Sequence, residues 1–421
     1  MKPSCPSIPF KTEAEGIGNI AAIESGDTTM QNNDRIAAIV PQVIGWRQAI
    51  HANPELGFAE HETAAFVAAK LKEFGLAVHT DVSATAVVAT LTRGRGGKAI
   101  VLRAELDALP IKEAADVVYA SRNDGVMHAC GHDGHTAMLL GAAKLLAEDE
   151  NFDGTVVFVF QPAEEVLGGG KKMIEDGLLK RFPVDQVFAV HNWPGFPEGH
   201  IGVRAGPQMA AVDDFEIVFR GSGCHAAMPH LGDDPLLAAA SFVTAIQRLV
   251  SRSVDPLSPA VLSVTQIHGG RFNNFVPGEV KVEGTCRFYD RALSDHCAAE
   301  IERVARSTAA IHGVSAELSY KRGYPPVVNP ANGAALAALA GSDTVGAERV
   351  STEFQPSMGC EDFAFLLQGV GDGAYVWIGA GDVGPGAGLH GDRFIFNDAI
   401  IPIGIRFFLN VVQRALPVGG R

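Results

Sequence analysis

The sequence has no uninterrupted apolar stretch close to the ~20 residues that a helix needs to span a bilayer, which excludes an integral membrane protein. It also has no block of Lys and Arg, and its net charge is −14. Because nucleic acids and anionic membranes bind clustered positive charge, neither is expected as a partner. With 421 residues, 47% of them hydrophobic and only 19% charged, the chain is not disordered or fibrous and has room for two domains.

Cysteine is sparse as well. The six cysteines are scattered without close pairs, so no disulfide framework is expected and a reduced, intracellular protein fits better. Residues 1–30 lack the basic head and apolar core of a signal peptide and are expected to form a loosely held tail. These features together predict a cytoplasmic location.

Hydrophobic periodicity outlines the start of the fold. Apolar residues recur every three or four positions from Ile36 to Ile50 and predict a helix, with a kink or a second helix start at Pro41. A second helix is expected to end at Gly75. Residues 86–91 and 99–102 flank a Gly-rich turn, which predicts a β-hairpin.

Later strands are continuously apolar. Residues 155–160, 187–190 and 374–379 are such runs, and apolar helical stretches lie between them. This alternation predicts an α/β fold in which helices flank both faces of a mainly parallel sheet. We expect residues 31–207 and 319–421 to form this domain.

Residues 208–318 follow a different order of elements: strand, helix, strand, strand, helix, strand. This βαββαβ order predicts a smaller α+β domain of the split βαβ type, inserted into the larger one. In its second helix one buried stripe is expected, made of Cys297, Ile301, Val304, Thr308 and Ile311.

Polar residues that can bind metals follow several of the predicted strands. Glu105 and Asp107 follow the strand at 99–102, and Glu164 and Glu165 follow the strand at 155–160. His191 directly follows the next strand, and His390 lies beyond the last one. Because ligands of open α/β sheets bind at the carboxyl ends of the strands, these side chains are expected to converge in one crevice.

The segment 127–135, Met-His-Ala-Cys-Gly-His-Asp-Gly-His, is the richest in such groups. Cys130 and His132 fit the turn before a helix, with Gly131 allowing the bend. A thiolate, imidazoles and carboxylates together favour zinc or a neighbouring divalent transition metal. The residues alone leave His191 and His390 open between a ligand and a hydrogen-bonded structural histidine. Solvated positions are expected for Glu60, His61, Glu62 and His79.

Adjacent glutamates have a chemical use at such a site. The side chains of Glu164 and Glu165 point in different directions, so one can bind metal while the other takes a proton from a metal-bound water. This pattern favours metal-assisted hydrolysis, but spacing does not name the substrate.

Ten motifs follow one another from about Ile36 to the C-terminus: HANPELGFAEHET (51–63), RAELDALP (103–110), MHACGHDGHT (127–136), FQPAEE (160–165), VHNWP (190–194), GCHAAMPH (223–230), GGRFNNFVP (269–277), EGTCR (283–287), CEDFAF (360–365) and LHGDRF (389–394). In these motifs and their order the chain resembles the amidohydrolase branch of the co-catalytic zinc metallopeptidases, which includes hippurate hydrolase, aminoacylase, indole-acetyl-amino-acid hydrolases and N-acetyl-diaminopimelate deacetylase.

The resemblance implies a catalytic domain with an inserted lid or dimerisation domain, through which a homo-oligomer is possible. It implies two divalent metal ions, zinc first and manganese, cobalt or nickel as alternatives. The implied ligands are Cys130, His132, Glu165, His191 and His390. Implied catalytic residues are Glu164 as general base, Asp107 beside the metals and His225 at the scissile carbonyl, while Asn274 and Arg287 would hold the substrate backbone and carboxylate.

The implied activity is hydrolysis of the amide bond of small N-acyl amino acids by a metal-bound water. A dipeptidase or an aryl-acyl-glutamate carboxypeptidase could use the same site. A thiol hydrolase with Cys130 as nucleophile and a non-catalytic binding module are the other classes considered. The chain departs from the family pattern at Glu105, Cys224, Cys360 and the pair Val166-Leu167, and none of these changes removes an implied ligand or the base.

Overall fold

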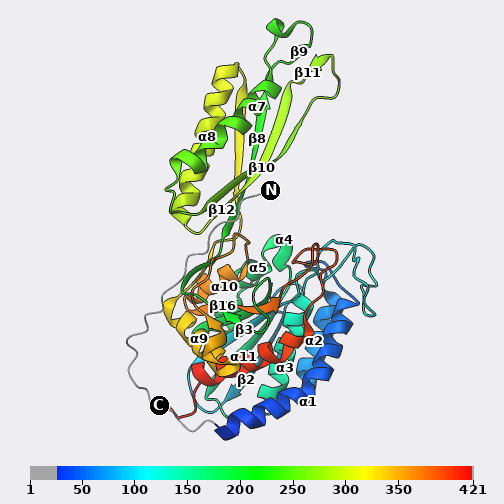
Figure 1. Cartoon of the computed structure of the whole chain (residues 1–421), viewed down its shortest axis with the longest axis vertical. Coiled ribbons are helices and arrows are strands. Elements are labelled where there is room, and N and C mark those ends of the chain that lie inside the picture. Colours follow the sequence, from blue (N-terminus) through cyan, green and yellow to red (C-terminus); the bar gives the residue numbers. More distant parts are fainter. Residues whose placement is uncertain (1–25, 420–421) are drawn as a thin grey trace, which may run out of the picture.

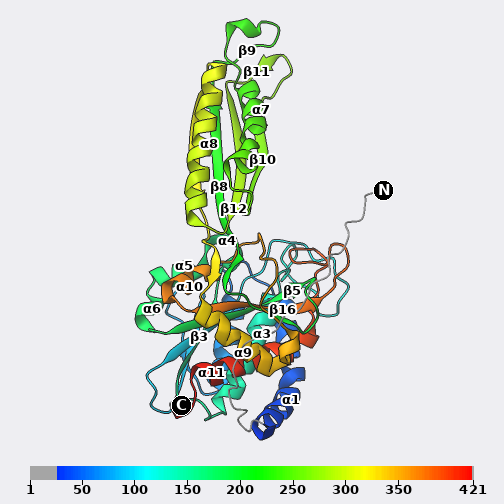
Figure 2. The ribbon, with the colours of Figure 1, turned by 60° about the vertical axis from the view of Figure 1, so that its left-hand side comes forward.

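A computed structural model describes residues 26–419 of the chain. It shows a larger unit that holds the first and last described elements, and an elongated smaller unit that projects from it (Figures 1 and 2). The described part of the chain has no helix long and apolar enough to cross a membrane.

The larger unit is built on an eight-stranded sheet with the order β1-β2-β4-β3-β5-β16-β6-β15. Its central pairs, β4 with β3, β3 with β5 and β5 with β16, are parallel, which confirms the predicted mainly parallel sheet. The strands are β1 (Ala77–His79), β2 (Val87–Arg93), β3 (Ala99–Glu105), β4 (Gly154–Gln161), β5 (Gln186–Pro194), β6 (Ile201–Gly202), β15 (Val350–Ser351) and β16 (Gly373–Gly381).

The predicted hairpin of residues 86–91 and 99–102 is wrong. Strand β4 lies between β2 and β3, antiparallel to β2 and parallel to β3. The reason is burial: Val156 and Phe158 pack into the core on one face of the sheet, and Val157 and Val159 into the core on the other. A strand that is apolar on both sides is stable only with neighbours on both edges.

Helices cover both faces of the sheet, as predicted. One face packs against α1 (Gly26–His51), α2 (His61–Glu73), α3 (His132–Ala147), α9 (Ala331–Val345) and α11 (Ile401–Ala415). The other packs against α5 (Gly169–Glu175), α6 (Leu178–Arg181) and α10 (Phe363–Val370).

Helix α1 differs from the sequence prediction at two points. It runs through Pro41 as one helix, so no second helix starts there. It also begins at Gly26, so residues 26–30 are helical and do not belong to the predicted tail; residues 1–25 lie outside the described part of the chain.

The smaller unit has the predicted βαββαβ order. Its antiparallel sheet has the strand order β10-β12-β8-β13, and two helices cover one face. Its elements are β8 (Ala211–Arg220), α7 (Pro235–Ile246), β10 (Ala260–Gly269), β12 (Glu279–Phe288), α8 (Arg291–His312) and β13 (Ser315–Arg322). A two-stranded ribbon, β9 (Cys224–His225) with β11 (Phe275–Val276), lies at the end remote from the larger unit (Figure 2).

Two details of this inserted unit differ from the prediction. Ile311 is 80% exposed, because the buried face of α8 turns toward Ala305 and Ala309. The sheet runs from Ala211 to Arg322, so the predicted limits, 208 and 318, fall a few residues early. Strand β7 (Gly206–Met209) pairs instead with β14 (Val327–Asn329), outside the inserted sheet.

Candidate metal centre

All five implied ligand residues come together beyond the carboxyl ends of β3, β4, β5 and β16. Ligand atoms of Cys130, His132 and His191 lie within 4.8 Å of one another, and so do those of Cys130, Glu165 and His390. We call these five residues the ligand cluster. Cys130 comes from the turn before α3 and His132 is the first residue of α3. The others come from the one-turn helix α4 (Glu164–Leu167), from β5 and from the loop after β16.

The distances within the ligand cluster fit shared metal ions. The Sγ atom of Cys130 lies 3.4 Å from Nε2 of His191, and Nε2 of His390 lies 3.2 Å from Oε1 of Glu165. Two ligands of a tetrahedral zinc ion, with Zn–S of about 2.3 Å and Zn–N of about 2.0–2.1 Å, would lie ~3.5 Å apart. The first pair therefore has the separation of two ligands of one ion.

Asp107 orients the His132 ring. Nδ1 of His132 lies 2.9 Å from the Asp107 carbonyl oxygen and 3.2 Å from Oδ1, while Oδ2 accepts the Glu165 N–H at 2.9 Å. This turns Nε2 of His132 toward the cluster, as second partners of metal-binding histidines do. Nε2 of His132 and Oε1 of Glu165 are buried without a hydrogen-bond partner, which is unusual unless an ion satisfies them.

Negative charge is concentrated here. Burial raises the pKa of the Cys130 thiol well above its ordinary value, and the carboxylates of Glu165 and Glu164 raise it further. Burial also raises the pKa of Glu164, with Glu361 and Glu165 adding to the effect. Burial alone would lower the pKa of His132, but Asp107 and the other carboxylates raise it to about 10. Such a group of acids is stabilised by cations, so the donor set fits divalent metals.

The contact between Cys130 and His191 is also the one that a thiol hydrolase would need between its nucleophile and its base. A thiol nucleophile needs a lowered pKa and a histidine able to hold the proton. Here burial raises the pKa of Cys130, while burial and the neighbouring His135 lower the pKa of His191. Both shifts oppose a thiolate–imidazolium pair, which counts against the thiol-hydrolase alternative.

Relatives place this centre in a family. The model of peptidase family M20/M25/M40 matches residues 101–414. The chain belongs to this M20 family. An N-acyl-L-amino acid amidohydrolase of Geobacillus stearothermophilus is 44% identical over 68% of this chain and 78% of its own length, and a hippurate hydrolase of Campylobacter jejuni is 36% identical over 88% and 95%. A solved dinuclear metal-binding M20 peptidase of Bacillus subtilis is 32% identical, with a TM-score of 0.79 over 90% of this chain and 99% of that one.

The M20 membership makes this protein a hydrolase of a dinuclear metal-binding family, as the sequence motifs predicted. The identity of the metal stays a prediction, as do the cytoplasmic location and the expected absence of nucleic-acid and membrane partners.

Sequence analysis did not predict the contacts of some residues that support the M20 centre. Buried Arg103 binds Glu361 and Asp362 through Nη2, at 2.9 and 2.8 Å, and Tyr375 donates to Glu361 at 2.8 Å. The motifs RAELDALP and CEDFAF already contained three of these residues, but nothing local showed that they meet.

Glu60 is a clear correction. It was expected to be solvated, yet it is fully buried and accepts hydrogen bonds from Thr85 and from the Ala163 N–H, the latter at 2.8 Å. Ala163 precedes the glutamate pair and has a positive φ of 53°, so Glu60 helps to hold a strained turn. His61 and Glu62 are exposed as expected, and His79 is half-buried.

A cavity of about 540 Å³ opens over the M20 centre. Cys130, Glu165, His191 and His390 of the ligand cluster form one part of its wall together with Glu164, and Arg287 at the near end of β12 forms another. The remaining wall is largely apolar and includes Trp193, Met209, Met358 and Leu389. Of the residues expected in the inserted unit, Arg287 therefore reaches the site.

His225 and Asn274 do not reach it within this chain. Both lie at the remote ribbon, where His225 pairs with Phe275 and the Ala226 N–H donates to the Asn274 carbonyl at 3.0 Å (Figure 1). From Glu279 at that end of β12 to Arg287 at the near end is eight residues, or ~27 Å at about 3.4 Å per residue.

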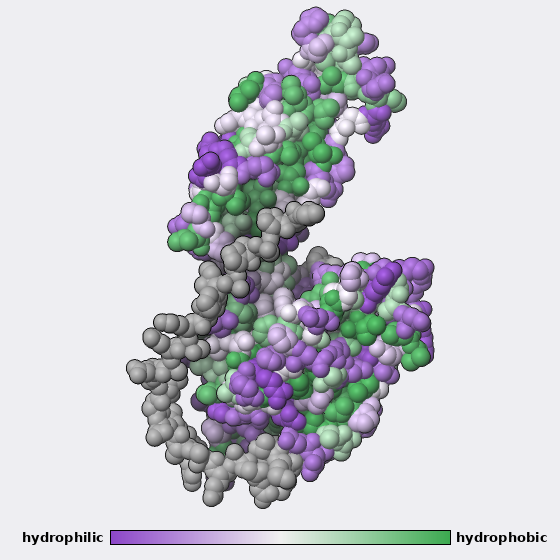
Figure 3. All heavy atoms as spheres, in the orientation of Figure 1, coloured by the Kyte–Doolittle hydropathy of each residue, from purple (hydrophilic) through white to green (hydrophobic). Residues whose placement is uncertain are grey.

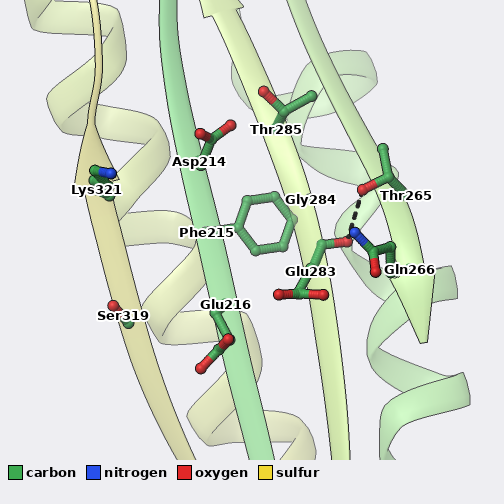
Figure 4. Close-up of a pocket in the computed structure, with 10 residues that line it drawn as sticks. All are labelled: Asp214, Phe215, Glu216, Thr265, Gln266, Glu283, Gly284, Thr285, Ser319 and Lys321. Carbon is green, nitrogen blue, oxygen red and sulfur yellow. Dashed lines mark hydrogen bonds between the residues drawn. The ribbon is translucent and has the colours of Figure 1, made fainter. Parts of the chain in front are cut away.

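A second cavity, of about 460 Å³, lies on the open face of the inserted sheet (Figure 4). Carboxylates of Asp214, Glu216 and Glu283 and the amine of Lys321 line it, with no histidine or cysteine among its lining residues. It lacks the donor set of the M20 centre.

Proposed function

We propose that this M20 hydrolase cleaves the amide bond of N-acyl amino acids, releasing a carboxylic acid and the amino acid. One observation carries the proposal: four residues of the ligand cluster, all but His132, line the same cavity as Glu164 and Arg287. A site with hydrolytic groups on one side and a guanidinium on the other fits an amide whose product amino acid has a free carboxylate. The names of the two curated relatives support the same substrate class.

Glu164 is proposed as the general base. One of its oxygens accepts the Asp362 N–H at 3.3 Å, and the other lies 3.9 Å from Nε2 of His132, so the carboxylate faces the ligand cluster. Its raised pKa suits a group that takes a proton from the attacking water and returns it to the leaving amine.

Cys130, His132, Glu165, His191 and His390 are proposed to hold two divalent ions, with Asp107 orienting His132 between them. Such ions would lower the pKa of a water and polarise the scissile carbonyl. The thiol and imidazole donors favour zinc, and manganese, cobalt and nickel remain the alternatives to test.

Arg287 is proposed to bind the substrate carboxylate. Its Nη1 donates to the Cys286 carbonyl at 3.0 Å and to Thr285 Oγ1, which fixes the side chain. Nε and Nη2 have no hydrogen-bond partner among the described residues and can pair with two carboxylate oxygens.

His225 and Asn274 are proposed to act at the site of a second copy of this chain. A hinge at the joint between the units could rotate the inserted sheet but could not shorten its ~27 Å length. Figure 3 shows hydrophobic side chains gathered over the part of the inserted unit that carries α7 and β10. Exposed apolar residues there and near the ribbon offer a surface for self-association: Leu231, Leu236, Leu237, Phe272 and Phe275.

The test is turnover of three substrate sets, N-acyl amino acids, unblocked dipeptides and aryl-acyl glutamates, each with added zinc, manganese, cobalt or nickel. We expect the N-acyl amino acids to give the highest kcat/KM. Preference for dipeptides or aryl-acyl glutamates would support the alternative activities, and no turnover of any set would contradict the proposal.

A further inference from the structure

Tyr324 lies where the chain returns from the inserted unit to the larger one. The Gly323 N–H donates to the Val212 carbonyl at 2.9 Å, and the Val212 N–H donates to the Tyr324 carbonyl at 3.0 Å. The two chain crossings, which form the narrow waist in Figure 2, are thus fastened to each other at Val212 and Tyr324. We call this pair of crossings the joint.

The side chain of Tyr324 reaches from the joint to the glutamate pair. Its hydroxyl donates to the Glu164 carbonyl at 2.6 Å and accepts the Gly168 N–H at 2.9 Å. Glu164 and Gly168 are four residues apart, the spacing at which the carbonyl and the N–H of an α-helix normally bond each other directly. The Tyr324 hydroxyl stands between them and bridges the two groups.

Helix α4 depends on such outside contacts for its position. It is a single turn without a side-chain cap, and the residues flanking it, Ala163 and Gly168, are both left-handed, with φ of 53° and 69°. One isolated helical turn has no stability of its own in water. Glu60 holds its start through the Ala163 N–H, and Asp107 holds the Glu165 N–H. Among these contacts, the Tyr324 bridge is the one that comes from the joint.

We propose that Tyr324 is a positioning residue that sets the place of Glu164 and ties it to the inserted unit. Arg287 pairs in register with Val212, and the Val212 N–H bonds to the Tyr324 carbonyl. Arg287, the proposed binder of the substrate carboxylate, and Glu164, the proposed base, are therefore linked through two residues of the joint, Val212 and Tyr324. This inference rests on the proposed roles of Glu164 and Arg287. It explains how the distance between these two residues is maintained.

The hydroxyl is not itself a catalytic group in this proposal. It donates one hydrogen bond and accepts one, both with backbone groups of the turn that it bridges. Its effect passes through Glu164. Without the hydroxyl, the Glu164 carbonyl and the Gly168 N–H lose the partner that they share, which would let α4 move and shift the carboxylate.

The test compares Tyr324→Phe with Tyr320→Phe. Phenylalanine at 324 keeps the ring beside Phe365, with the ring centroids 6.0 Å apart in the native protein, and removes only the bridge. Tyr320 is a matched control, because its hydroxyl donates to Asp213 within the inserted unit at 2.8 Å. We expect Tyr324→Phe to lower kcat by up to ~10²-fold, the cost of misplacing a catalytic group by about 1 Å, with KM and metal content unchanged. Tyr320→Phe should match the native enzyme.

Two further measurements distinguish a positioning role of Tyr324 from a general structural role, and one of them does not depend on which substrate the enzyme cleaves. In a Glu164→Gln background, Tyr324→Phe should cause no further loss, because both changes act through one group. A crystal structure of Tyr324→Phe should show α4 and the Glu164 carboxylate displaced from their native positions, a result that needs no turnover. Kinetics use whichever amide the native enzyme cleaves, so failure on N-acyl amino acids contradicts only the proposed function. Native kcat, a change in KM alone, additive losses or an unfolded variant would each overturn the role of Tyr324.

Discussion

The Sγ atom of Cys130 lies 3.4 Å from Nε2 of His191, although 61 residues separate them in the sequence. The contact follows from the sheet: β3 and β5 are parallel neighbours, His191 lies on β5, and Cys130 lies on the turn before α3 beyond the end of β3. His191, whose role the residues alone left open, thus lies in contact with Cys130.

Cys130→Ser should lower metal content and activity together, because the thiolate is a metal ligand in this account. Metal analysis beside kinetics on the same sample checks it, with Cys286→Ser as a control for loss of a buried thiol in the inserted unit. A variant with full metal occupancy and no activity would favour a thiol nucleophile instead.

Substitutions of Glu164 and Glu165 should have different effects, one on turnover and the other on metal binding. Glu164→Gln should keep its metal and lose ~10²–10⁴-fold in kcat, the usual contribution of a general base. Glu165→Gln should weaken metal binding itself, since Oε1 of Glu165 faces His390 in the ligand cluster. Equal metal loss in the two variants would show that these roles are assigned wrongly.

Arg287→Ala should leave the metal in place and reduce transition-state stabilisation by roughly 2–4 kcal/mol in kcat/KM, as expected for a lost charged contact. Replacing the substrate carboxylate by a carboxamide should hurt the native enzyme far more than the variant. Both substrates are measured on both enzymes, and an equal carboxamide penalty with and without Arg287 would contradict the role.

His128 should make the protein sensitive to acid. Burial lowers its pKa from 6.5 to about 4, and neither ring nitrogen has a hydrogen-bond partner. Between pH 6.5 and 4 the unfolded chain binds a proton at this residue and the folded chain does not. The free energy of unfolding therefore decreases as the pH is lowered through this range, by about 3 kcal/mol in all. His128→Gln should remove this part of the pH dependence of the urea-unfolding free energy, whereas His61→Gln, at an exposed position, should not. An unchanged profile in His128→Gln would contradict the prediction.

Local patterns predicted the buried strands but not where they end: Glu105 is the last residue of β3, and His191 lies within β5, which runs to Pro194. The runs at 155–160, 187–190 and 374–379 lie within β4, β5 and β16, because continuous apolar, β-branched sequence is stable only in a sheet buried on both faces. The order of elements in the inserted unit was predictable for a similar reason, since each strand and helix has its own period.

Long-range partners were not predictable in the same way. The predicted hairpin of β2 and β3 was wrong because β4, an apolar strand, pairs between them, and β4 begins only at Gly154, after β3 has ended at Glu105. Glu60 was misjudged because its partner, the Ala163 N–H, is 103 residues away. Tyr324 carried no local signal, since its hydroxyl meets Glu164 across 160 residues.

The central claim is that one metal-dependent centre, built on the ligand cluster and Glu164, hydrolyses N-acyl amino acids. Its most direct test is to measure metal per chain and turnover of N-acetyl and N-benzoyl amino acids on the same sample, before chelation, after chelation and after metal is returned. We expect two ions per chain at full activity, loss of turnover when the metal is removed, and recovery of turnover when the metal is returned. Full turnover by the metal-free protein would show that the metal centre does not catalyse the hydrolysis.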